Sequence, residues 1–119
     1  MKPLVYIASP YTKGDPAINT RFQCEIWDKL FTDGYVTPYA PLWSHFQHTV
    51  FPRGYKDWTR FDDEIIKRCD ALLRLDAEHE PLGYVQTESS GADHEVELAN
   101  ALGKLVFYDI ASLYHWAKQ

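Results

Sequence analysis

Short, continuous runs of apolar residues recur along the chain and predict buried strands. The first run covers residues 4–8 and ends in Ser9 and Pro10, which favour a loop. Similar runs follow at residues 35–38, 71–75 and 105–108. Runs without apolar–polar alternation are typical of strands covered on both faces, so the pattern indicates a parallel sheet.

Segments with helical spacing of apolar residues lie between the predicted strands. Asp15 and Pro16 form a typical helix start, and apolar side chains then recur every fourth residue until Gly34 ends the pattern. The same reasoning predicts helices over residues 55–69, from Ser90 to Gly103 and after Asp109. The proline-punctuated aromatic segment at residues 38–52 is predicted to be a loop with room for a short helix.

Strands that alternate with helices predict an α/β fold. We expect a three-layer, flavodoxin- or Rossmann-like sandwich, with a mostly parallel sheet of four or five strands and helices on both faces. The length of 119 residues suits one hydrophobic core, so we expect a single domain over residues 1–119. Ligands of such sheets bind beyond the carboxyl ends of the strands. A binding site is therefore expected to combine residues 9–14, residues 43–48 and the start of the helix after Glu88.

Composition and charge narrow the function classes. The chain carries 12 Lys and Arg against 17 Asp and Glu, a net charge of -5, and no basic run, so no nucleic-acid partner is expected. The apolar run at residues 4–8 is too short for a signal or a membrane span, so a cytoplasmic location without membrane contact is expected. Cys24 and Cys69 are expected to be buried thiols. His45 and His48 lack a carboxylate partner, so neither a metal nor a cofactor is expected.

The informative candidates for chemistry are carboxylates, because the usual phosphate-loop, dinucleotide, nucleophile-elbow and zinc-protease motifs do not occur in the sequence. Glu95 falls in the first two turns of the helix that is predicted to open at Ser90, where the helix dipole favours an ionised carboxylate. Such a carboxylate could attack an anomeric carbon. Glu97 falls on another face of that helix. A solvated surface charge is the alternative interpretation of both glutamates.

Three stretches of the chain resemble a known family. They are residues 6–12, residues 62–70, and residues 89–95 with their continuation to Lys104. In their order and spacing the chain resembles the nucleoside 2-deoxyribosyltransferase superfamily, which includes 2'-deoxynucleoside 5'-phosphate N-hydrolases, CMP N-hydrolases and small uncharacterised phage and bacterial proteins. The resemblance implies the same α/β fold and a homodimer or higher homo-oligomer.

The resemblance also implies three catalytic residues. The family's nucleophilic glutamate matches Glu95, and the tyrosine of its first strand, which touches that carboxylate, matches Tyr6. Its catalytic aspartate lies eight residues ahead of the aspartate that opens the third strand and matches Asp62, with the adjacent Asp63 as the alternative. Asp70, which opens the strand, is expected to be structural.

A substrate-binding set follows from the same resemblance. Six residues before the nucleophile, the transferases place an aspartate that holds the sugar 5'-hydroxyl, whereas the nucleotide hydrolases place a serine that helps to bind the 5'-phosphate; this chain has Ser89. Hydroxyls and N–H groups at a helix start attract a phosphate, whereas a second carboxylate would repel it. The residues expected around the phosphate are Ser9, Thr12, Arg21, Ser89, Ser90 and Gly91. A solvent-facing position is the alternative for Arg21. Trp43 and His45 are expected at the base.

The expected activity is hydrolysis of the N-glycosidic bond of a ribo- or deoxyribonucleoside 5'-monophosphate through a glycosyl-enzyme on Glu95. Asp62 is expected to protonate the departing base, and Tyr6 to orient the nucleophile. One alternative is a deoxyribosyltransferase, in which a second base takes the sugar from the same intermediate. The other is a nucleotide-binding sensor or interaction module without turnover. In each case the partner is a small-molecule nucleotide or nucleoside.

Overall fold

The computed structural model describes residues 1–75 and 90–119. The strands are β1 (Leu4–Ala8), β2 (Thr37–Tyr39), β3 (Ala71–Arg74) and β4 (Leu105–Phe107). The helices are α1 (Pro16–Asp33), the 3-10 helix η1 (Pro41–Trp43), α2 (Ser44–Val50), α3 (Tyr55–Ile66), α4 (Ser90–Ala101) and α5 (Ile110–Ala117). Within the described residues, no helix is both long and apolar enough to cross a lipid bilayer.

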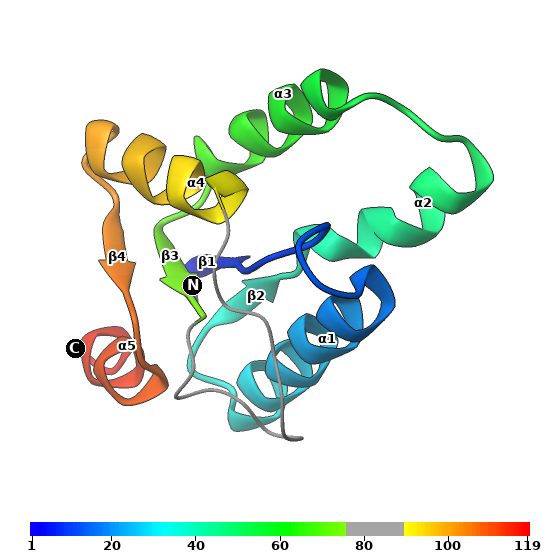
Figure 1. The fold of residues 1–119 in the computed structure, drawn as a ribbon. Helices are drawn as coiled ribbons and strands as arrows, with labels where there is room; N and C mark the ends of the chain where they lie inside the picture. Colours follow the sequence, from blue (N-terminus) through cyan, green and yellow to red (C-terminus); the bar gives the residue numbers. More distant parts are fainter. Residues whose placement is uncertain (76–89) are drawn as a thin grey trace.

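The four strands form one parallel sheet in the order β2-β1-β3-β4 (Figure 1). The register places Tyr6 of β1 beside Tyr39 on one side and beside Leu72 on the other. The predicted parallel α/β fold is confirmed. Because β1 and β3 occupy the centre, the loops that leave their carboxyl ends meet near the middle of the sheet, where ligands of such folds bind.

Helices cover both faces of the sheet, and alternate residues of β1 supply both cores. Val5 and Ile7 pack with apolar residues of α1 and α5, including Leu30 and Leu113. On the other face, residues of β1 pack with the helices α3 and α4, through Ile66, Ala92 and Ala99 among others. Tyr6 points to this second face and is fully buried. The alternation that makes a two-faced core thus also sends the Tyr6 hydroxyl towards α3 and α4.

The ends of α1 follow the local signals in the sequence. Asp15 caps the helix, because its carboxylate accepts hydrogen bonds from the N–H groups of Ala17 and Ile18. Gly34 adopts the left-handed conformation with a φ of 82° and donates its N–H to the carbonyl of Leu30. The predicted helix and both of its ends are confirmed.

Several predicted boundaries move by a few residues. The second strand begins at Thr37 rather than at Tyr35, because the ladder starts where the Thr37 N–H meets the carbonyl of Pro3, and a proline has no N–H to extend it further. The third helix ends at Ile66 rather than Cys69. The N–H groups of Arg68 and Cys69 bond to carbonyls three residues back, those of Ile65 and Ile66, instead of four residues back as in an α-helix. Ser90 is the first residue of α4. The aromatic segment after β2 is more helical than expected, because it forms η1 and α2.

Candidate functional site

A cavity of about 330 Å³ lies beside the carboxyl ends of the central strands, between the segments that follow β1 and β2 and the helices α3 and α4. Its volume is in the range of small-molecule sites. Among the described residues, the carboxyl side chains that line it are Asp62, Asp63 and Glu95, and the cationic ones are Lys13 and Arg53. The other lining residues are Tyr6, Ser9, Tyr11, Thr12, Pro41, Leu42, Ser44, His48, Tyr55, Trp58, Thr59, Gly91, Ala92 and His94.

A hydrogen bond between β1 and α4 holds Glu95 at the cavity wall. The hydroxyl of Tyr6 donates to Oε2 of Glu95. The pKa of Glu95 is raised to about 8, chiefly by burial and to a lesser extent by the charges of Asp62 and Asp63, whereas the hydrogen bond from Tyr6 favours the ionised form. Burial, together with the charge of Glu95, raises the pKa of Tyr6 well above its ordinary value, so the tyrosine stays a hydrogen-bond donor.

Asp62 on α3 lines the same cavity and is partly protonated near neutral pH. Its pKa is raised to about 7, chiefly by burial and in addition by the charge of the adjacent Asp63. Its Oδ1 atom is buried and has no hydrogen-bond partner among residues 1–75 and 90–119. A carboxyl group in this state is suited to give a proton to a bound ligand.

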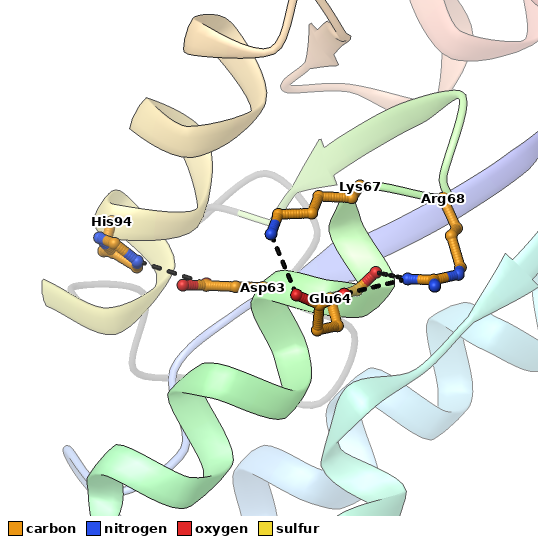
Figure 2. A network of polar contacts seen from close by, with 5 residues as sticks. All are labelled: Asp63, Glu64, Lys67, Arg68 and His94. Atoms are coloured by element: carbon orange, nitrogen blue, oxygen red, sulfur yellow. Dashed lines mark hydrogen bonds and ion pairs between the residues drawn. The ribbon is translucent and has the colours of Figure 1, made fainter.

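The neighbouring Asp63 lines the cavity and also contacts α4. Its Oδ1 lies 3.4 Å from Nε2 of His94, and Figure 2 shows the two side chains pointing towards one another. Glu64 points the other way and pairs at the surface with Lys67 and Arg68 (Figure 2). The contact between Asp63 and His94 joins the helices that carry Asp62 and Glu95.

A buried arginine lies at the carboxyl end of β3. Arg74 is 8% exposed, donates to the carbonyl of Leu75, and has Nη2 placed 3.5 Å from Oδ1 of Asp93. Its positive charge lowers the pKa of Glu95 and so opposes the effect of burial. In the sequence, Arg74 falls within the third apolar run, and its charge belongs to the surroundings of Glu95.

Two buried amides of α1 fix the first loop of the cavity. Nδ2 of Asn19 donates to the carbonyls of Tyr11 and Lys13. Nε2 of Gln23 donates to the hydroxyl of Ser9 at 2.8 Å, while its Oε1 accepts the N–H of Leu42 at 2.9 Å. Both amides are almost completely buried, so they satisfy polar groups of the loop that water would otherwise have to hydrogen-bond. The loops after β1 and β2 are therefore tied to the same helix.

Hydrogen bonds among His48, Trp58 and Arg53 hold another part of the cavity wall. Nδ1 of His48 accepts a hydrogen bond from Nε1 of Trp58 at 3.0 Å and another from the backbone N–H of Arg53 at 3.1 Å. These contacts connect α2 with the start of α3. All three residues line the cavity.

The structure brings together some of the residues expected from the sequence. Tyr6, Asp62 and Glu95 line the cavity, and so do Asp63 and the expected phosphate contacts Ser9, Thr12 and Gly91. Ser89 and the side chain of Ser90 lie outside the described part of the chain.

Three other expected binding residues lie beside the cavity or away from it. Arg21 is on the outer side of α1, with a side chain 72% exposed and paired with Glu25. Trp43 packs on Trp27 and Tyr39. The Nδ1 atom of His45 is 2.6 Å from the Tyr11 hydroxyl, so His45 touches a lining residue without being one.

Four residues that line the cavity beside α2 and on α3 were not expected from the sequence: Arg53, Tyr55, Trp58 and Thr59. Trp58 precedes Asp62 by one helical turn, so helical spacing alone could have placed it beside the acid. Lys13 lies within the loop that was expected to bind a ligand. No sequence signal indicates that His94 meets Asp63. Among residues 1–75 and 90–119, no group of three His, Cys, Asp or Glu side chains is arranged to hold a metal ion.

The fold and cavity define an α/β protein in which the carboxyl groups of Asp62, Asp63 and Glu95 share a pocket beside the carboxyl ends of the central strands. Among solved structures, seven chains match this one. One is described as a 2-desoxiribosyltransferase from Leishmania mexicana, with a TM-score of 0.57 and 20% sequence identity. The match covers 87% of this chain and 61% of that chain. It confirms the fold that the resemblance to the nucleoside 2-deoxyribosyltransferase superfamily implied. Comparison with protein-family models gives no match, and neither does comparison with curated protein sequences.

Proposed function

We propose that the protein hydrolyses the N-glycosidic bond of a nucleoside 5'-monophosphate. The observation that carries this proposal is the hydrogen bond from Tyr6 to Glu95 in a cavity that Asp62 also lines. A buried carboxylate oriented by a tyrosine, with a protonated carboxyl group nearby, provides the nucleophile and the acid of a retaining glycosidase. The fold shared with a 2-desoxiribosyltransferase supports the same class of chemistry.

The first step forms a glycosyl-enzyme. Oε1 or Oε2 of Glu95 attacks C1' of the sugar, and the electron pair of the bond from C1' to the base nitrogen leaves with the base. Asp62 gives its proton to the base, so the base departs neutral and Asp62 becomes a carboxylate. In the second step Asp62 takes a proton from water as the water oxygen attacks C1', and the bond from C1' to the Glu95 oxygen breaks with its electron pair staying on Glu95. This releases the sugar 5-phosphate and restores the Glu95 carboxylate and the protonated Asp62.

The surroundings of the two carboxyl groups favour this assignment of roles. Tyr6 donates to Glu95 and Arg74 lowers the pKa of Glu95, so both stabilise the ionised nucleophile. Within the described residues, no hydrogen bond stabilises Oδ1 of Asp62 as a carboxylate, and the pKa of Asp62 is raised to about 7, chiefly by burial. The reaction uses the form in which Glu95 is ionised and the proton is on Asp62. Because the pKa of Glu95 is about 8, this form is the less populated one near neutral pH, and the contacts of Glu95 with Tyr6 and Arg74 raise its share.

The cavity also has features suited to a phosphate. Lys13 and Arg53 supply positive charge in its lining, and Ser9 and Thr12 supply hydroxyls. Gly91 in the first turn of α4 adds the start of a helix, whose N–H groups and dipole favour an anion. These features support a nucleotide as the substrate rather than a nucleoside.

A deoxyribosyltransferase is the second candidate, supported by the description of the matching structure. Both reactions begin with the same glycosyl-enzyme and differ in whether water or a second base attacks C1'. An added free base distinguishes them, because a transferase makes a new nucleoside from it and a hydrolase does not.

The deciding experiment incubates the protein with ribo- and deoxyribonucleoside 5'-monophosphates and with the matching nucleosides, and follows free base by chromatography. We expect base release from monophosphates, and none from Glu95→Ala. Glu97→Ala is the matched control, since Glu97 lies on the same helix and is exposed. Ligand-induced thermal stabilisation without any product would instead support a nucleotide-binding module.

We also propose that the protein works as a homodimer. Several apolar side chains on α2 and at the start of α3 are exposed: Phe46, Val50, Phe51 and Tyr55. Exposed apolar groups gathered near a binding site often mark an interface. Phe46→Asp is expected to yield monomers in light-scattering chromatography, whereas Phe31→Asp on α1, also at an exposed apolar position, is expected to leave the mass unchanged.

A further inference from the structure

The hydrogen bonds of His48 fix which ring nitrogen carries its hydrogen. Nδ1 accepts from Nε1 of Trp58 and from the backbone N–H of Arg53. Both partners are donors only, so Nδ1 must present its lone pair, and the hydrogen of the neutral ring must be on Nε2. The Nδ1 edge of the ring is occupied by these contacts. The edge that remains for a ligand in the cavity carries the Nε2–H donor.

The proposed reaction places the departing base next to this wall. Asp62 must reach the base to protonate it, so the base lies along α3. Trp58 is four residues before Asp62 on the same face of the helix, a rise of about 6 Å, which is close to the width of a nucleobase. His48 is hydrogen-bonded to Trp58 at that end. The sugar and phosphate then extend towards Ser9 and Gly91, which also line the cavity.

We propose that His48 reads the far edge of the base, and that its Nε2–H donates to a carbonyl oxygen at position 6 of a purine or position 4 of a pyrimidine. This inference rests on the proposed function and names its substrate class: nucleotides of oxo bases, such as hypoxanthine or uracil, in preference to amino bases. An amino group in the same place would direct its own N–H donor at the Nε2–H donor of His48, and no hydrogen bond could form. Two unsatisfied polar groups in an enclosed site cost about 10- to 100-fold in kcat/KM.

Two substitutions separate the specificity role of His48 from its structural role. His48→Asn keeps an acceptor oxygen near the position of Nδ1 and removes the donor at Nε2. His48→Gln keeps a donor near the position of Nε2 and loses the acceptor for Trp58. His115→Asn on α5 is the matched control, because His115 is outside the cavity lining.

The experiment compares kcat/KM for inosine and adenosine 5'-monophosphates and for uridine and cytidine 5'-monophosphates. The wild type and His115→Asn are expected to prefer the oxo base by at least 10-fold in one pair. His48→Asn should lose at least 10-fold of that ratio, while His48→Gln keeps the ratio even if its Tm falls. A wild type that favours amino bases, or a His48→Asn variant with an unchanged ratio, overturns the inference.

Failure of the proposed function gives a different result. If the wild type releases no base from any nucleotide, hydrolysis is rejected, and the same variants are then compared by calorimetric binding of inosine and adenosine 5'-monophosphates. Tighter binding of the oxo nucleotide that is lost in His48→Asn supports the inference without catalysis. Equal binding of the two nucleotides, or binding of neither, overturns it.

Discussion

The hydroxyl of Tyr6 donates a hydrogen bond to Oε2 of Glu95, a residue 89 positions later in the chain. Tyr6 belongs to a central strand and is fully buried, so the sheet itself fixes the position of the donor. Glu95 comes from α4, which packs on that face of the sheet. The proposed nucleophile is therefore oriented from a buried central strand of the sheet, and its ionisation is coupled to that contact.

Loss of this hydroxyl should change the pH dependence of catalysis. The hydrogen bond from Tyr6 lowers the pKa of Glu95, so Tyr6→Phe raises that pKa and moves the acidic limb of the kcat/KM profile to higher pH. We expect kcat/KM at pH 7 to fall about 10- to 100-fold, with partial recovery at higher pH. Tyr39→Phe, a change on the neighbouring strand outside the cavity lining, should leave the acidic limb in place. A uniform loss at every pH would contradict this account.

Removal of the proposed acid should depend on the leaving group. Asp62→Asn is expected to lower kcat about 10²- to 10⁴-fold with natural nucleotides, because the base then leaves without a proton. The loss should be small for a sugar phosphate that carries p-nitrophenolate, a leaving group that needs no proton. Single-turnover kinetics with both substrates measures the difference.

The adjacent aspartate provides the matched comparison. The charge of Asp63 raises the pKa of Asp62, so Asp63→Asn should lower that pKa and move the basic limb of the kcat/KM profile to lower pH. The variant should still distinguish the two leaving groups as the wild type does. If Asp63→Asn rather than Asp62→Asn shows the leaving-group effect, the two aspartates exchange roles.

The carboxyl groups of the site should make folding less favourable as pH rises. Burial raises the pKa of Glu95 from 4.5 to about 8, so the folded protein binds this proton more tightly than the unfolded chain does. The free energy of unfolding therefore falls as pH increases from about 4.5 to about 8, and the loss is complete above the raised pKa. Glu95→Gln lacks this titration and should have the higher Tm at pH 8, by several degrees for a gain of about 1 kcal/mol. Denaturation measured between pH 5 and pH 9 tests the slope, and equal slopes for both proteins would reject it.

The buried amide of Gln23 should matter for both stability and activity. Gln23→Leu preserves the size of the side chain but leaves the N–H of Leu42 and the carbonyl of Ile7 without this partner. We expect a loss of about 2–4 kcal/mol in the free energy of unfolding, measured by urea titration. Gln47→Leu on the exposed side of α2 should change it by less than about 0.5 kcal/mol. A Gln23→Leu variant as stable as the wild type would show that the loops do not depend on this residue.

Local signals in the sequence predicted the framework. The caps at Asp15 and Gly34 act within a few residues of the helix ends, so they could be recognised without knowledge of the fold. The continuous apolar runs likewise follow from burial on both faces of the sheet, which the structure confirms. From the parallel order of the strands, the position of the cavity at their carboxyl ends could be predicted as well.

The walls of the cavity depend on contacts between residues that are distant in the sequence, and fewer of these contacts could be predicted. Trp43 was expected at the base, but the aromatic rings of Trp27 and Tyr39 pack against it outside the lining. His48 belonged to the segment 43–48 that was expected at the site, but its partner was not predicted, because its contact with Trp58 forms when α2 and α3 come together. Such pairings are set by the packing of helices, for which a single sequence gives no periodic signal.

The wall that contains Trp58 also gives the protein an optical property. The chain has four tryptophans, all within residues 1–75 and 90–119, and of these Trp58 alone lines the cavity. Its indole N–H is bonded to a ring that a bound nucleotide would touch. Intrinsic fluorescence should therefore report ligand occupancy through one indole, while the emission of Trp27, Trp43 and Trp116 follows the integrity of the surrounding fold.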